Sequence, residues 1–173
     1  MRCYLAVSGG FTTPSVLNSR SFCKGITPEH TLAKGMVLPI GEKVSELPAQ
    51  PSTLPLQEVG RTLNGYKGPE YDAIMDRLAG RLTNNSFTIA PQSNRLAYIL
   101  EGLPPLSLPE MNTVPVQPGT VQLTPSGKLM VLMRDAQVTG GYPRIFQLTE
   151  RSCNLLAQKR GGEQLTIELE KQL

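Results

Sequence analysis

Residues 119–133, GTVQLTPSGKLMVLM, carry the strongest local folding signal in this chain. Two apolar runs, TVQL and KLMVLM, flank TPSG, and such a turn between short runs predicts an antiparallel β-hairpin. The stretch that follows, DAQVTGGYPR at residues 135–144, gathers two glycines, a tyrosine, a proline and an arginine. An ordinary turn needs only one or two such residues. We therefore predict that this loop forms part of a small-molecule site, with a glycine bulge at a barrel corner as the alternative.

Short apolar runs separated by glycine and proline continue over most of the chain. There are 16 glycines and 15 prolines among 173 residues, and aromatic residues make up only 5%. This punctuation indicates many short strands, so we predict a mainly β fold, a mostly antiparallel β-barrel with two covering helices. The predicted strands are residues 3–10, 35–41, 57–63, 86–90, 95–102, 120–123, 128–133, 144–148 and 163–169.

Two segments carry helical signals instead. Residues 68–82 place Pro69 at a first helical position and repeat apolar residues at spacings of three and four, which predicts a helix with one buried face. Residues 149–162 predict a shorter helix, with Thr149 as its N-cap and Gly161 as its C-cap after two basic residues. The proline-rich residues 104–119 are predicted to be a loop.

Composition argues against several classes of protein. The net charge of +3 is small and scattered, so we expect no nucleic-acid partner. No apolar run reaches membrane-spanning length and the start MRCYLAVSGG lacks a signal-peptide core, so we expect no membrane partner and a cytoplasmic location. Three widely spaced cysteines fit reduced thiols in that compartment. Because His30 is the only histidine, no metal site is predicted.

Two polar clusters are candidate binding segments. In NSRS, residues 18–21, an arginine lies between two serines and could hold a carboxylate or phosphate; the alternative is a turn capped by serine side chains. In APQSNRLAY, residues 90–98, consecutive amide, hydroxyl and guanidinium groups suit a ligand with amide and carboxylate groups; the alternative is an ordinary hairpin loop. The candidate residues of these clusters are Ser19, Arg20, Ser21, Gln92, Ser93, Asn94 and Arg95.

The glycine-rich loop after the hairpin is the third cluster. Its paired glycines permit positive φ or a close approach of the backbone to a ligand, and its tyrosine offers a hydroxyl. Arg134 or Arg144 could hold an anion beside it. The candidate residues of the loop itself are Gln137, Gly140, Gly141 and Tyr142.

Three stretches, in chain order, carry a family resemblance: YLAVSGGFTTPSVLNSRS, APQSNRLAY and DAQVTGGYPRI. Together they resemble the carboxyltransferase A/B-subdomain family. That family includes the C-type subunit of 5-oxoprolinase, KipA, chains labelled allophanate hydrolase subunit 2, and the carboxyltransferase part of urea carboxylase. The resemblance extends from near residue 2 to about residue 168. It implies cyclophilin-like β-barrels and a partner of similar fold, the B-type subunit.

The resemblance also implies a domain organisation. Family members begin well upstream of YLAVSGG, so this chain is expected to lack the family's N-terminal segment. Residues 1–41 are then the remnant of a first β subdomain, residues 42–56 a proline-rich linker, and residues 57–173 a cyclophilin-like β-barrel subdomain. Within the second motif the chain departs from the family, with Ala97 in place of a glycine and Ile99 in place of an arginine.

The function that the resemblance implies is that of one component of an ATP-dependent 5-oxoprolinase. In that branch, the B-type and C-type subunits phosphorylate 5-oxoproline with ATP and Mg, and the A-type subunit completes ring opening to glutamate. Arg95, Ser93 and Asn94 are then the expected catalytic residues, and the remaining candidates bind the small amide substrate. Two alternatives are a biotin-dependent carboxyltransferase domain, which uses carboxybiotin from a partner to act on urea or a similar amide, and a non-enzymatic KipA-like regulator that binds a kinase inhibitor.

Overall fold

The computed structural model describes residues 4–23, 25–27, 31–43, 60–78, 82 and 85–170. Contacts within the chain define two units, one within Cys3–Pro55 and the other within Leu56–Leu173, and each is described by itself. His30 and residues 44–56 of the predicted linker lie outside the described residues.

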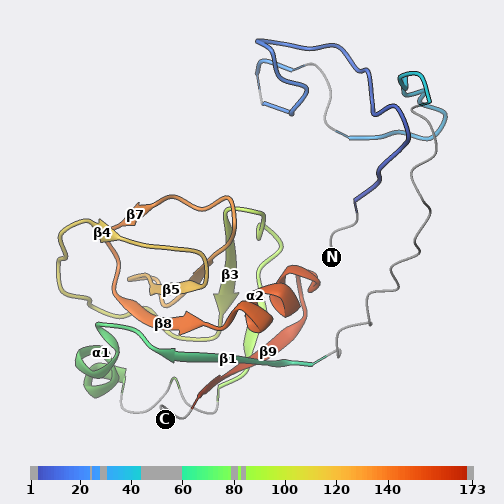
Figure 1. Cartoon of the computed structure of the whole chain (residues 1–173). Coiled ribbons are helices and arrows are strands. Elements are labelled where there is room, and N and C mark those ends of the chain that lie inside the picture. Colours follow the sequence, from blue (N-terminus) through green and yellow to red (C-terminus); the bar gives the residue numbers. More distant parts are fainter. Residues whose placement is uncertain are drawn as a thin grey trace. The chain divides into compact units, whose positions relative to one another are not determined.

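The second unit is built around a closed barrel of seven strands in the order β1-β8-β5-β6-β3-β2-β9 (Figure 1). Every neighbouring pair is antiparallel except β1 and β9, which are parallel and close the barrel. The predicted mainly β, mostly antiparallel barrel is therefore confirmed. The barrel strands are β1 (Thr62–Lys67), β2 (Phe87–Ile89), β3 (Ala97–Glu101), β5 (Thr120–Leu123), β6 (Leu129–Leu132), β8 (Arg144–Leu148) and β9 (Gln164–Leu169).

A second, two-stranded sheet lies outside the barrel. It pairs β4 (Val114–Pro115) with β7 (Thr139–Gly140) in antiparallel register. Both strands fall within segments that the sequence predicted to be loops. Strands of two residues carry no alternation that a sequence could show, because the period of a strand needs several residues to be recognised.

The barrel interior follows from the alternation of its strands. Val121 on β5 is in register with Val131 on β6 and with Phe146 on β8, and none of the three is more than 2% exposed. Phe87 and Leu63 are also completely buried. Each such side chain contributes about 1.5–3 kcal/mol through burial, so this core dominates the stability of the unit.

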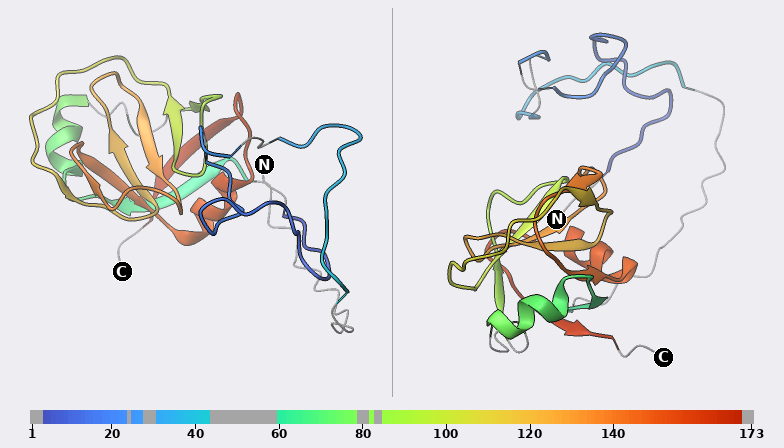
Figure 2. Two further views of the ribbon diagram at one scale, coloured as in Figure 1. Left: turned by 90° about the horizontal axis from the view of Figure 1, so that it is seen from above. Right: turned by 90° about the vertical axis from the view of Figure 1, so that its left-hand side faces the viewer.

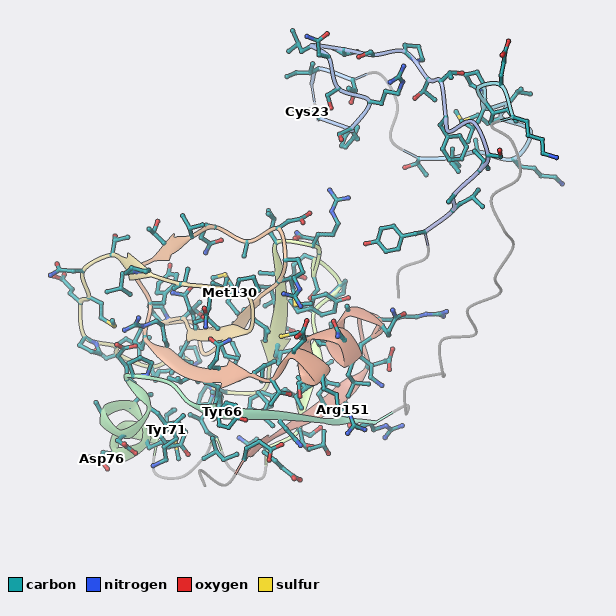
Figure 3. All side chains as sticks on the ribbon, in the orientation of Figure 1. Cys23, Tyr66, Tyr71, Asp76, Met130 and Arg151 are labelled. Carbon is teal, nitrogen blue, oxygen red and sulfur yellow. The ribbon has the colours of Figure 1, made fainter. Side chains whose placement is uncertain are left out.

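Helix α1 (Tyr71–Leu78) covers the barrel with the predicted apolar face (Figures 2 and 3). Tyr71 and Ile74 are buried, and the Tyr71 ring lies 5.5 Å from that of Phe146 on β8. Asp76, on the opposite face, is exposed. The helix begins three residues later than predicted because residues 68–70 form a turn, in which the Tyr71 amide donates to the Gly68 carbonyl at 3.1 Å.

Helix α2 (Glu150–Ala157) has the predicted N-cap and a different end. The Thr149 Oγ1 accepts from the Ser152 amide at 3.2 Å, which confirms the cap. Gln158 is the C-cap, so the prediction of Gly161 was wrong. The chain leaves the helix there because tertiary contacts take over: the Gly162 amide donates to the Ile89 carbonyl at 2.8 Å and leads into β9. Neither helix, nor any other in the described part of the chain, is long and apolar enough to cross a membrane.

The first unit contains no regular strand among its described residues. The predicted strands at 3–10 and 35–41 are therefore wrong for their described parts. A bridge joins Phe11 to Ile40, and the Gly41 amide donates to the Gly10 carbonyl at 3.0 Å. Gly10 has a positive φ of 69°, so the backbone turns where a strand would have to continue.

The bounds of β1 also differ from those predicted. The sequence predicted a strand at 57–63, of which residues 57–59 lie outside the described residues, whereas β1 begins at Thr62 and continues to Lys67. Its second half, NGYK, includes Asn64 and Gly65, residue types that disfavour strands when taken alone. Pairing with β8 and β9 on both sides overrides this local preference.

Candidate functional site

A hollow of about 660 Å³ lies between the turn that precedes β3 and the turn that follows α2. It is lined by residues 93–96, 98, 135 and 159–161. Three of the predicted site residues, Ser93, Asn94 and Arg95, are therefore brought together with segments that are about 40 and 65 positions further along the chain. The end of α2 lies next to β3 in Figure 1, and this proximity forms the hollow.

The hollow carries an excess of positive charge. Arg95, Lys159 and Arg160 line it, together with the carboxylate of Asp135. The Glu163 carboxylate lies 3.5 Å from Lys159, so among the described residues three cations stand against two carboxylates. Lys159 is only 5% exposed, whereas the Arg95 side chain is 73% exposed. A concave surface with this charge and volume favours a small anionic ligand.

Ser93 and Asn94 use their polar atoms to shape the turn. The Ser93 Oγ accepts from the Ile99 amide at 3.0 Å, and the Asn94 Oδ1 accepts from the Leu96 amide at 2.8 Å. Such local bonds explain why QSNR folds as a turn between β2 and β3. Gln92 is exposed and does not line the hollow; its carbonyl accepts from the Asn94 side chain at 3.4 Å.

Arg95 forms an ion pair with Asp135, from the segment between β6 and β7. Its Nε lies 2.9 Å from the Asp135 Oδ2, and the Asp135 amide donates to the Arg95 carbonyl at 3.2 Å. Sequence reasoning missed Asp135 as a site residue. Its only signal was its place as the first residue of DAQVTGGYPR, because nothing local links it to a turn 40 residues earlier.

The Lys159 segment is held in place from the barrel. Buried Tyr98 on β3 donates its hydroxyl to the Ala157 and Lys159 carbonyls, at 3.4 and 3.3 Å. The Lys159 Nζ lies 3.5 Å from a carboxylate oxygen of Glu163, whose other oxygen accepts from the Arg160 amide at 2.7 Å. That amide, and secondarily the Lys159 charge, hold the pKa of Glu163 below its usual value. Sequence reasoning used Lys159 only as a helix-end charge, and no local signal marked it as buried.

The glycine-rich loop lies apart from this hollow. Gln137, Gly141 and Tyr142 are exposed, and none of them lines it. Gly140 packs over the buried Gln122 side chain, whose Nε2 donates to the Tyr142 carbonyl at 3.1 Å. A Cβ at Gly140 would lie 2.5 Å from that Nε2. The sequence predicted that the backbone at this glycine would approach a ligand, and the structure shows that it approaches the Gln122 side chain of the protein itself.

The two arginines beside the loop bind carboxylates of the protein itself. Arg144 makes a bidentate pair with Glu70, at 2.7 and 3.0 Å, and this pair lowers the pKa of Glu70. Arg134 donates to Glu150 at 2.7 Å. Neither arginine lines the hollow around Arg95.

The NSRS cluster belongs to the first unit. The Arg20 Nε donates to the Thr13 carbonyl at 2.8 Å, and the Ser21 amide donates to the Ser19 Oγ at 3.1 Å. Asn18 has a positive φ of 61°, as expected for a tight turn. Within this unit the three candidate residues stabilise a turn.

The fold and the hollow define a closed β-barrel domain with a basic hollow at its surface. The model of the family described as the carboxyltransferase domain, subdomain A and B, matches residues 1–169. This chain belongs to that family.

Two curated relatives are similar over most of this chain. It is 34% identical to the C subunit of 5-oxoprolinase from Haemophilus influenzae, over 95% of this chain and 55% of that protein. It is 36% identical to the C subunit of 5-oxoprolinase from Escherichia coli, over 91% of this chain and 53% of that protein. The chain thus spans about half the length of these relatives.

Solved structures agree with the fold. A crystal structure of TTHA0988 is 27% identical, with a TM-score of 0.60 over 76% of this chain and 27% of that one. The structure of the K. lactis urea amidolyase has a TM-score of 0.62 and covers 92% of this chain and 11% of that protein. The two sequences are 19% identical, so this similarity supports the fold alone.

Proposed function

We propose that this chain acts in an ATP-dependent 5-oxoprolinase, where it works with the A-type and B-type subunits to convert 5-oxoproline to glutamate. The names of the two curated relatives support this assignment. The structural observation that supports it is the basic hollow, which is lined in part by the exposed side chain of Arg95. Its volume suits a small ligand, and its charge complements the carboxylate of 5-oxoproline.

In this proposal Arg95 binds the substrate directly. A guanidinium can engage a carboxylate through two parallel hydrogen bonds, which fixes orientation as well as position. Ser93 and Asn94 act by holding the turn, because their side chains accept hydrogen bonds from the backbone of residues 96 and 99. They are therefore positioning residues for Arg95.

ATP with Mg supplies the phosphoryl group in the proposed reaction. Arg160 and Lys159 are the described residues of the hollow whose charges fit phosphate oxygens. The residues that line the hollow form no glycine-rich phosphate loop in the described part of the chain, so in this proposal these side chains hold the anion by charge and position.

The test is to co-purify the chain with the A-type and B-type subunits and measure ATP hydrolysis with and without 5-oxoproline. We expect stimulation by 5-oxoproline that requires this chain, and its loss in Arg95→Ala. Arg134→Ala is the matched control, because Arg134 is an exposed arginine that pairs with a carboxylate outside the hollow. Normal turnover by the Arg95→Ala assembly would refute the role of Arg95.

The family description supports a second candidate, a carboxyltransferase domain. In this candidate the domain acts on urea or a similar small amide. It would receive carboxybiotin from a partner and use the same cations to bind the carboxyl group being transferred. A stable complex without stimulation by 5-oxoproline, together with carboxyl transfer from free carboxybiotin to urea, would support this candidate. A stable complex with neither activity would support a KipA-like regulator.

A further inference from the structure

Asp135 occupies the place that a ligand carboxylate would take on Arg95. We propose that Asp135 is an internal competitor, which holds the Arg95 guanidinium until a carboxylate ligand displaces it and so lowers the affinity of the hollow for carboxylates. This inference rests on the proposed function for its choice of ligand, 5-oxoproline. It adds a residue that sets how tightly Arg95 binds a carboxylate ligand, although the residue itself is not expected to contact that ligand.

The geometry of the pair allows this exchange. The Asp135 Oδ2 lies 2.9 Å from the Arg95 Nε, and the two side chains are 49% and 73% exposed. Exposed ion pairs are held weakly because water competes with each partner. A second carboxylate can therefore replace that of Asp135 at little cost.

The backbone keeps the two residues together while their side chains separate. The Asp135 amide donates to the Arg95 carbonyl at 3.2 Å, and the Ala136 amide donates to the Met133 carbonyl at 3.1 Å. Displacement thus needs only a rotation of the Asp135 side chain into solvent. Asp135 can return to Arg95 as soon as the ligand leaves.

Two carboxylates lie close to the cations of the hollow, those of Asp135 and Glu163, and they differ in how they are held. Glu163 contacts both Lys159, at 3.5 Å, and the Arg160 amide, at 2.7 Å. It is therefore tied to the segment whose residues 159–161 line the hollow. Asp135 has one ion-pair partner within the described part of the chain, Arg95, so it is the carboxylate free to exchange.

Paired probes test the proposal directly. The full chain, alone and assembled with the A-type and B-type subunits, is titrated by calorimetry with 5-oxoproline and with 2-pyrrolidinone, which has the same lactam ring without the carboxylate. We expect Asp135→Asn to bind 5-oxoproline roughly two- to fivefold more tightly, as expected for release of one exposed ion pair. Binding of 2-pyrrolidinone should not change, and Arg95→Ala should lose the preference for 5-oxoproline.

Glu150→Gln is the matched control. It removes the carboxylate from the Arg134 pair, which at 2.7 Å is about as short as the 2.9 Å pair of Arg95 and lies outside the hollow. Its affinity for 5-oxoproline should equal that of the unsubstituted chain. Circular dichroism of each variant confirms that the barrel remains folded.

The proposal is overturned if Asp135→Asn binds 5-oxoproline no more tightly than the unsubstituted chain, or if neither of them binds it. It is also overturned if Asp135→Asn gains the same affinity for 2-pyrrolidinone, or if Glu150→Gln gains the same affinity for 5-oxoproline. The outcome is separable from that of the proposed function. Substrate-stimulated turnover with unchanged binding by Asp135→Asn refutes the competitor alone. A gain in binding without turnover refutes the oxoprolinase assignment and keeps the carboxylate site.

Discussion

Two arginine–carboxylate pairs of this protein differ in what surrounds them. Arg95 and Asp135 are largely exposed beside the hollow, whereas Arg144 and Glu70 are 22% and 23% exposed and are joined by three hydrogen bonds from Arg144. The first pair can exchange partners. The second joins the entry of α1 to β8 and is expected to stabilise the fold.

Glu70→Gln should lower the free energy of unfolding by about 1–3 kcal/mol at pH 7, since it removes charged hydrogen bonds from a half-buried guanidinium. The pKa of Glu70 is lowered in the folded state by Arg144, so this stabilisation is present above the ordinary pKa of 4.5 and is lost as pH falls through the lower folded value. Urea unfolding at pH 7 and at pH 3 measures the difference. Asp72→Asn, which breaks an exposed pair with Lys67, is the control and should have little effect. A deficit in Glu70→Gln that does not shrink at pH 3 would contradict this account.

Gly140→Ala should destabilise the protein by about 1–3 kcal/mol, because the new methyl group would lie 2.5 Å from the Gln122 Nε2 in a packed interior. Gly141→Ala is the control, since its Cβ would meet nothing closer than 3.9 Å. Thermal unfolding followed by circular dichroism compares the two. Equal melting temperatures for both variants would show that the Gln122 side chain can move away from the new methyl group without loss of stability.

At the scale of elements, helix α2 shows which boundaries are local and which are not. Its start depends on Thr149 and Ser152, three residues apart, and the sequence predicted it correctly. Its end depends on contacts of the following turn with β3 and with Ile89, which are far away in the chain. The helix therefore ends at Gln158, and the glycines at 161 and 162 lie in the turn that leads into β9.

Thr149→Ala should lower the free energy of unfolding by about 0.5–2 kcal/mol, the usual cost of losing an N-cap. The Oγ1 of Thr149 accepts from the Ser152 amide at 3.2 Å, and alanine leaves that amide without its partner. Thr149→Ser keeps the hydroxyl and should retain most of the stability. Urea unfolding of both variants tests the cap, and an equal loss in the two would assign the effect to the methyl group.

At the scale of the whole barrel, closure depends on β1 and β9, the first and last strands of the second unit. They pair in parallel, from Thr62 opposite Thr166 to Gly65 opposite Leu169. Leu165 on β9 is 1% exposed and lies in register with Phe87 on β2. The last strand is thus part of the same core as the first.

Leu165→Ala should cost about 2–5 kcal/mol of the free energy of unfolding, the range for truncating a buried leucine. Gln164→Ala, at the exposed neighbouring position, should change it by less than about 0.5 kcal/mol. Urea unfolding followed by circular dichroism measures both. A small effect of Leu165→Ala would mean that β9 contributes little to the barrel.

Local patterns in the sequence determined much of this protein. The runs at 120–123 and 144–148 became β5 and β8 with the predicted bounds, and TPSG became the turn between β5 and β6. The apolar face of α1 and the cap of α2 were also predictable. Each depends on side chains within a few residues of one another, where periodicity and turn chemistry apply.

Tertiary structure alone decided the barrel closure and the composition of the hollow. The parallel pairing of β1 with β9, the contact of Arg95 with Asp135 and the burial of Lys159 each join residues far apart in the chain. In the first unit, apolar runs that resemble strands in the sequence form no regular strand among the described residues. A strand exists only where a neighbour accepts its hydrogen bonds, and a binding surface only where distant side chains meet, so neither can be deduced from local sequence.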